Sequence, residues 1–191
     1  MNPLTHFFTG WVLANSAPSL GTRERAIVTL AGVVPDVDGL GAIADWATRN
    51  STHPLDWFSR YHHQLHNVTF GVIVGGLGYF IARKHRWTAC LLAFASFHLH
   101  LLEDILGARG PDGYNWPIPY LLPFSNRLQL RWSGQWALNG WQNFAITGVL
   151  LAATFWLAWS RGYSPLEMIS KRADAKFVAT LRQRFSPSKS H

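Results

Sequence analysis

The sequence predicts an all-α fold, a small polytopic membrane helix bundle built from two helical hairpins and one further membrane helix. Two observations favour this class over an ordinary soluble domain. Hydrophobic residues make up 48% of the 191 residues, whereas charged residues make up only 14%. The apolar residues also fall in runs that short basic turns separate, which is typical of membrane helices and their flanking anchors.

The two predicted hairpins share one plan. In the first, residues 7–20 are apolar, the turn GTRER follows, and residues 26–35 run back to the acidic motif PDVD. In the second, residues 68–82 lead to the turn RKHR, and residues 87–102 run back to the acidic pair that ends HLLED. Both basic turns then lie at one end of the bundle, so we expect the histidines and aspartates to gather at the other end.

The further membrane helix is predicted over residues 143–160, a run with about the length of one bilayer crossing. A loop rich in Gly, Pro and Trp precedes it, and we expect residues 113–141 of this loop to cover a site and to hold acyl chains. The chain is therefore divided into a membrane-embedded domain, residues 1–162, and a basic, partly disordered tail, residues 163–191.

The formal net charge of +7 could suggest a nucleic-acid partner, but the basic residues form short clusters between apolar segments instead of one stripe. No nucleic-acid partner is expected, and the bilayer is the expected partner; the oligomeric state is left open. Because Lys and Arg favour the cytoplasmic side, we predict a multi-pass protein of the cytoplasmic (inner) membrane. Its tail would be cytoplasmic, and its polar cluster would lie at the non-cytoplasmic face.

The single Cys90 allows neither an intrachain disulfide nor a cysteine-based zinc site, so histidines and carboxylates must hold any metal ion. His100 and Asp104 are four residues apart, which on a helix places them on one face, where they can bind one ion together. Glu103 adjoins this face as a ligand, a supporting group or a base, and His98 points to a different face. The alternative is a polar helix end whose residues are satisfied separately.

The motif YHHQLHN places three histidines directly before an apolar run. His62 and His66 are four residues apart, and His63 reaches His66 at three, so either pair could face inward. We expect at least one metal ligand here, with His66 favoured and His62 next, because imidazole is a common ligand of transition metals.

The acidic motif PDVD supplies Asp36 and Asp38 at alternate positions, and carboxylates so spaced can bind or bridge two cations. The alternative is a capped helix end and turn. His6 precedes the first apolar run, so the hairpin plan brings it to the same end as Asp36. Asp112 is a minor candidate because it follows the helix that carries His100.

With these residues assembled, the chain resembles the YdjM-like family of bacterial membrane-bound metal-dependent hydrolases. The match runs in order from His6 through PDVD, HHQLHN and HLLED to NWPIPYLLPFSNR, roughly residues 1–131. The family has an HRGxTHS-like motif where this chain has YHHQLHN, a departure that leaves His62 and His63 as alternatives. A more distant similarity connects the helical pair His100 and Asp104 with the HxxxD pair of the zinc-dependent phospholipase C group.

The residues and the resemblance together predict that residues 1–162 form a membrane-bound metal-dependent hydrolase. It would cleave an ester or phosphoester bond of a membrane lipid or another amphiphilic substrate through a metal-activated water. One or two Zn²⁺ ions are expected, although Mn²⁺ or Fe²⁺ would accept the same ligands. The predicted metal ligands are His6, Asp36, Asp38, His62, His66, His100 and Asp104.

Either Glu103 or Asp38 would take the proton from the attacking water. The alternative function is that of a non-catalytic membrane protein with a structural metal site or a partner-binding role. A structural site is closed by protein ligands, whereas a catalytic site keeps one position for water.

Overall fold

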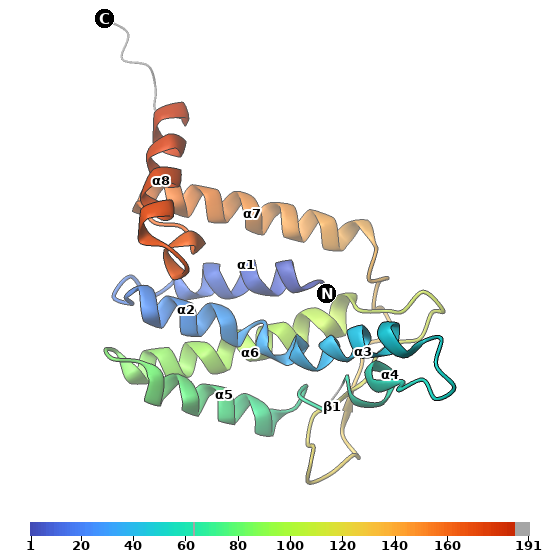
Figure 1. Cartoon of the computed structure of the whole chain (residues 1–191). Helices are drawn as coiled ribbons and strands as arrows, with labels where there is room; N and C mark the ends of the chain where they lie inside the picture. Colours follow the sequence, from blue (N-terminus) through green and yellow to red (C-terminus); the bar gives the residue numbers. More distant parts are fainter. Residues whose placement is uncertain (63, 186–191) are drawn as a thin grey trace, which may run out of the picture.

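The computed structural model describes residues 1–62 and 64–185 of the chain. The chain is mostly helical, as its sequence predicts, and its longer helices lie side by side in a bundle (Figure 1). α1 lies against α2, α6 and α7, and α5 lies against α6. The helices of the bundle are α1 (Pro3–Ala14), α2 (Thr22–Ala31), α5 (Val68–Ile81), α6 (Arg86–Gly107) and α7 (Trp141–Arg161).

Short elements are inserted at one end of this bundle, the right-hand end in Figure 1. The PDVD motif lies inside a 3₁₀ helix, η1 (Val34–Leu40), and α3 (Gly41–Thr48) and α4 (Trp57–Tyr61) follow it. A two-stranded antiparallel sheet, β1 (Ile118–Pro119) and β2 (Gln129–Leu130), folds the long loop before α7. These two short helices were not among the elements expected from the sequence, because the segment between residues 41 and 61 has no long apolar run.

Two helices of the described residues, α6 and α7, are long and apolar enough to cross a membrane. A third candidate is the pair formed by α2 and the segment Val34–Thr48, which is bent by 53°. α5, with 14 residues, is apolar but shorter than a full crossing. Large apolar side chains are exposed on the outside of the bundle, with Phe80 77% and Val149 70% exposed, as expected for a surface that faces lipid.

Glycines set the close spacing of the helices. A Cβ atom at Gly71 of α5 would lie 2.9 Å from the Phe97 ring of α6, and one at Gly10 of α1 would lie 2.7 Å from the Thr29 carbonyl oxygen of α2. These contacts leave no room for a larger side chain. The core beneath consists of Ala31, Val74, Ala93, Phe97, Leu101 and Ile118. This packing holds α1, α2 and α6 close enough for their polar side chains to meet.

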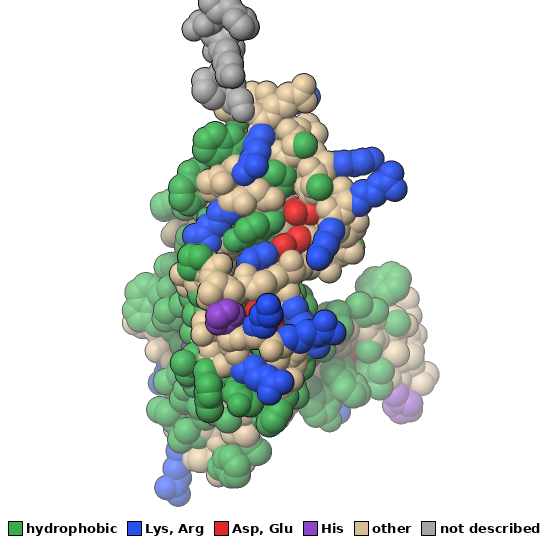
Figure 2. Space-filling model, turned by 90° about the vertical axis from the view of Figure 1, so that its left-hand side faces the viewer, with side chains coloured by type: hydrophobic (Ala, Val, Ile, Leu, Met, Phe, Trp, Pro, Cys, Tyr) green, Lys and Arg blue, Asp and Glu red, His purple; other side chains and the backbone are tan. Residues whose placement is uncertain are grey.

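The opposite end of the bundle is basic. Figure 1 places the α1–α2 turn, the α5–α6 turn and the end of α7 together on its left, and Figure 2, which looks at this end, shows Lys and Arg side chains gathered there. Asp36 and Asp104 lie toward the other end of the bundle, at η1 and near the end of α6. The chain therefore separates its cationic end from its His/Asp cluster along the axis of the helices.

The segment expected to be a partly disordered tail is folded over residues 163–185, whereas residues 186–191 lie outside the described part. It contains η2 (Pro165–Met168) and α8 (Lys171–Phe185), which lies crosswise to α7 (Figure 1). Asp174 accepts hydrogen bonds from the backbone N–H and hydroxyl of Ser164, at 2.7 and 2.6 Å. The tail prediction was based on basic composition, which does not reveal these capping contacts.

A buried ion pair holds this segment to the bundle. Arg25 of α2 donates two hydrogen bonds to Glu167 of η2, at 2.7 and 2.9 Å, and its guanidinium lies 3.8 Å from the centre of the Tyr163 ring. Thr22 donates a further hydrogen bond to Glu167 at 2.8 Å. Since both charged side chains are largely buried, the loss of one partner leaves the other charge uncompensated.

We predict that Arg25→Ala lowers the free energy of unfolding by about 3 kcal/mol, because Glu167 would remain buried without its cation. The change should also expose α8 to trypsin. Thermal unfolding in detergent and limited proteolysis measure the two effects. Arg23→Ala is the matched control, since Arg23 is an exposed residue of the same turn. Equal behaviour of the two variants would contradict the anchoring role.

Candidate metal centre

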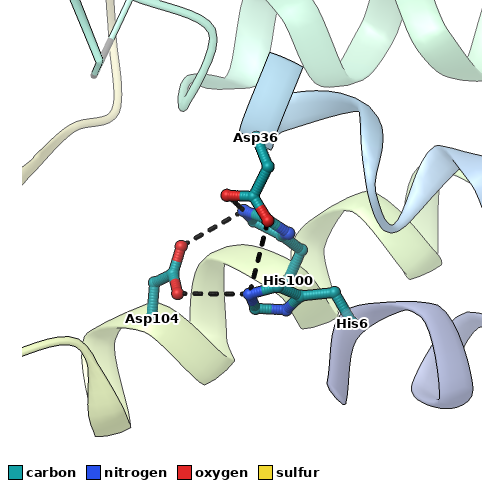
Figure 3. Close-up of side chains that lie close together, drawn as sticks. All are labelled: His6, Asp36, His100 and Asp104. Atoms are coloured by element: carbon teal, nitrogen blue, oxygen red, sulfur yellow. Dashed lines mark ion pairs between the residues drawn. The ribbon is translucent and has the colours of Figure 1, made fainter. Parts of the chain in front are cut away.

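Four side chains from three elements converge (Figure 3), toward the end of the bundle opposite the α1–α2 and α5–α6 turns. α1 provides His6, η1 provides Asp36, and α6 provides His100 and Asp104. One ligand atom from each residue lies within 4.8 Å of the corresponding atoms of the other three. Such a group could hold a metal ion, because nitrogen and carboxylate oxygen ligands surround a single point.

The α6 pair has the spacing that a helix imposes. His100 Nε2 lies 3.1 Å from Asp104 Oδ2 and 3.7 Å from Asp36 Oδ1. His6 Nε2 lies 3.3 Å from Asp104 Oδ1 and 4.0 Å from Asp36 Oδ2. Each imidazole therefore faces both carboxylates, and His6 and His100 are each only 1% exposed.

The second ring nitrogen of each imidazole, Nδ1, lies at hydrogen-bond distance from an acceptor outside the cluster. His100 Nδ1 lies 2.8 Å from the carbonyl oxygen of Gly32, which can only accept a hydrogen bond, so Nδ1 carries the proton. The neutral ring then presents the lone pair of Nε2 to the cluster. This arrangement, in which the second nitrogen is fixed by a backbone or carboxylate acceptor, is typical of metal-bound histidine.

His6 is oriented in the same way by Glu103. His6 Nδ1 lies 2.6 Å from Glu103 Oε2, and the hydroxyl of Thr9 donates to the other carboxylate oxygen. Glu103 therefore lies behind the His6 ring, on the side away from the cluster. Thr9 was not predicted from the sequence, although its place three residues after His6 on one helix puts the two on adjoining positions.

His66 adjoins the four-residue group. Its Nε2 lies 3.2 Å from His100 Nε2 and 3.6 Å from Asp104 Oδ2, and its Nδ1 lies 3.5 Å from Asp38 Oδ2. Burial by itself would lower the pKa of His66, but hydrogen bonding to Asp104 and Asp38 and the charges of these carboxylates raise that pKa to about 9. Without a bound cation, His66 is therefore protonated at neutral pH.

Asp38 orients the histidine motif. Its Oδ1 lies 2.9 Å from His62 Nδ1, and its Oδ2 accepts a hydrogen bond from the backbone N–H of Leu65 at 3.2 Å. His62 stacks on Phe58, with ring centres 4.3 Å apart. His63, the alternative to His62, lies outside the described residues. Asn67, the last residue of the motif, caps α5 by accepting the N–H of Phe70 at 2.9 Å, which fixes the start of the helix directly after His66.

The remaining candidates from the sequence lie elsewhere. His98 turns away from the cluster, and its ring contacts the Phe94 carbonyl oxygen at 2.8 Å and the Tyr120 hydroxyl at 3.0 Å. Asp112 is exposed and accepts the backbone N–H of Tyr114 at 3.1 Å, which stabilises a turn. Neither residue belongs to the four-residue group.

The residues present fit a bound cation. His6 Nε2 and Asp36 Oδ2 are buried and have no hydrogen-bond partner among the described residues, yet both face the centre of the group. Buried polar atoms without partners are costly, and a metal ion would satisfy both.

A cavity of about 250 Å³ opens beside the group. Carboxylates and imidazoles form its polar lining, and the loop before α7 contributes Trp116 and Leu138. The polar lining consists of Asp36, His62, His66 and Asp104. Individual loop residues at the cavity were not predicted from the sequence, because no local pattern distinguishes Trp116 from the other tryptophans of the loop.

The fold and the site together define a helical membrane protein with a buried His/Asp group that could hold a metal ion. The model of a family described as YdjM inner membrane protein matches residues 1–172, and the chain belongs to this family. No curated protein and no solved structure matches the chain. The distant similarity to the phospholipase C group therefore stays a prediction.

We predict that purified protein binds Zn²⁺ and that His100→Ala weakens this binding by at least about 100-fold, because it removes a ligand and not merely a supporting group. Metal analysis and competition with a chromogenic chelator measure the effect. His98→Ala is the matched control on the same helix and should bind metal as the unchanged protein does. Identical metal content in both variants would rule out this centre.

Proposed function

We propose that the protein is a metal-dependent hydrolase of the inner membrane that cleaves an ester or phosphoester bond of a lipid or another amphiphilic molecule. The observation that carries this proposal is the contact between the His/Asp group and the cavity. Asp36 and Asp104 belong both to the four-residue group and to the cavity wall. A substrate in the cavity would therefore meet the metal ligands directly.

His6, His100, Asp36 and Asp104 would hold the ion, and His66 lies close enough to Asp104 to serve a second one. Zn²⁺ fits this mixed nitrogen and oxygen set, and Mn²⁺ or Fe²⁺ would accept it too. When bound, such an ion lowers the pKa of a coordinated water and polarises the bond to be cleaved.

The supporting residues have separate tasks in this proposal. Glu103 holds the His6 ring so that Nε2 faces the metal, and Asp38 holds the His62 ring at the cavity. His62 would take the proton of the attacking water and pass it to the leaving oxygen, since it lines the cavity and Asp38 holds its other ring nitrogen. Glu103 and Asp38 would then act through histidines and not on the water itself.

A structural metal site is the second candidate, and the cavity argues against it. A structural ion is enclosed by protein ligands, whereas a catalytic one keeps a position open to water and substrate. Four members of the polar cluster line a cavity here, including two residues of the four-residue group. In the remaining alternative, the folded tail binds a partner. That role needs no metal ion and gives the buried His/Asp group no function.

We further propose that the basic end is cytoplasmic and that the His/Asp group lies at the non-cytoplasmic face, because Lys and Arg are retained on the cytoplasmic side. In a Cys90→Ser background, Lys84→Cys should be labelled only from the cytoplasmic side. Asp112→Cys should be labelled from outside the inner membrane. Both replaced residues are exposed, so access is not limited by packing. Labelling of both from one side would refute this orientation.

Hydrolysis can be tested with zinc-loaded protein in micelles that contain phosphatidylglycerol or phosphatidylcholine, with products identified by mass spectrometry. We expect cleavage that a chelator abolishes and added Zn²⁺ restores. His100→Ala should lower the rate by at least about 1000-fold, because metal-activated water provides most of the rate enhancement.

The control for this assay is again His98→Ala, which should retain the rate of the unchanged protein. Stoichiometric metal binding without cleavage of either lipid would favour a structural metal site. Cleavage that survives both the chelator and His100→Ala would show that another part of the protein, or a contaminant, is responsible.

A further inference from the structure

The cavity at the metal centre adjoins a second one. Pro111 and Leu138 line both, so the two hollows meet along one wall. The second cavity has a volume of about 600 Å³ and lies between the start of α1 and the first turns of α7. Its lining is Asn2, Leu4, Arg109, Pro111, Leu138, Asn139, Phe144 and Thr147.

The second cavity opens to the outside of the bundle. Leu4 is 61% exposed and Phe144 is 68% exposed, and these residues belong to the outward faces of α1 and α7. In a membrane, such a surface contacts acyl chains. Thr147, which lines the cavity, forms a hydrogen bond of 2.7 Å with the hydroxyl of Thr5, so α1 and α7 are joined beside this groove.

Arg109 provides the only charge in the groove among the described residues that line it. Its backbone is fixed on both sides, because its N–H donates to the Trp136 carbonyl at 3.2 Å and its carbonyl accepts the Leu138 N–H at 3.0 Å. Arg109 is half-buried, and its guanidinium group has no hydrogen bond or ion pair within residues 1–62 and 64–185. An unpaired guanidinium on a fixed backbone beside an apolar groove is suited to bind a phosphate group.

We propose that the groove binds an anionic phospholipid, with its negatively charged group on Arg109 and one acyl chain along Leu4 and Phe144. This inference rests on the proposed hydrolase function, and it names an anionic membrane lipid as the substrate. The polar end of the lipid extends past Pro111 and Leu138 into the first cavity, where it meets the metal centre. No acidic side chain lines the groove among the described residues, so the negative charge of an anionic lipid meets no like charge beside Arg109, whereas the cation of a zwitterionic lipid offsets the attraction of its phosphate to Arg109.

Lipid retention tests this inference independently of turnover. Zinc-loaded protein is transferred into neutral detergent with equal amounts of phosphatidylglycerol and phosphatidylcholine, and bound lipids and their cleavage products are counted by native mass spectrometry. We expect preferential retention of phosphatidylglycerol, and Arg109→Gln should lower that preference about fivefold. Arg109→Lys should retain most of it, because the charge remains.

Two further variants separate the effect of the Arg109 charge from the effect of the contact with the acyl chain. Arg127→Gln removes an exposed arginine of the same loop that does not line the groove, and it should leave the preference unchanged. Phe144→Ala should lower the retention of both lipids while their ratio stays the same. An equal preference in the Arg109→Gln and Arg127→Gln proteins, or no preference in the unchanged protein, would overturn the inference.

The same experiment distinguishes failure of the lipid groove from failure of the hydrolase function. A preference that depends on Arg109 without cleavage of either lipid would support the lipid groove and refute the hydrolase. Cleavage of both lipids at equal rates, with no effect of Arg109→Gln on retention, would support the hydrolase and refute the groove.

Discussion

The pairing of two buried imidazoles with two carboxylates at one end of the bundle is the constraint on which the arrangement of the helices depends. His6 and His100 are almost completely buried, and unpaired charges or polar atoms in such a place would cost several kcal/mol each. Their inner nitrogens face Asp36 and Asp104, and their outer nitrogens are satisfied by Glu103 and by the Gly32 carbonyl. α1, the end of α2 and α6 must therefore approach closely at this point.

Small residues leave the space that this close approach of the helices requires. The contact of Gly32 with Ser96 and of Gly10 with Thr29 leaves no room for a Cβ atom, so α2 lies close to both α1 and α6. The same closeness brings the Gly32 carbonyl to His100. At the far end, Arg25 and Glu167 form a second buried ion pair, which joins the segment after α7 to α2. Polar pairs at the two ends thus determine how the apolar helices are aligned.

The two aspartates of PDVD illustrate how a short motif is divided between tasks. Both were predicted as metal ligands, because alternate carboxylates can share an ion. The 3₁₀ helix instead directs Asp36 to the four-residue group and Asp38 to His62 and the Leu65 N–H. Glu103 and Asp104 are divided in a similar way, since neighbouring residues on a helix point in directions about 100° apart. Asp104 faces the cluster, whereas Glu103 contacts Nδ1 of His6 on the side away from the cluster.

The sequence by itself determined the helical class, the apolar segments and the end of the bundle at which His6, PDVD, HLLED and the histidines His62 and His66 gather. These properties depend on composition, on helical periodicity and on the alternation of basic turns with polar ends, all of which are local. Only the tertiary structure decided that Asp38 and Glu103 orient histidines, that Gly32 and Thr9 take part, and that Arg109 lies beside an apolar groove. Each of these depends on contacts between segments far apart in the chain, and a backbone carbonyl or an unpaired guanidinium leaves no pattern in the sequence.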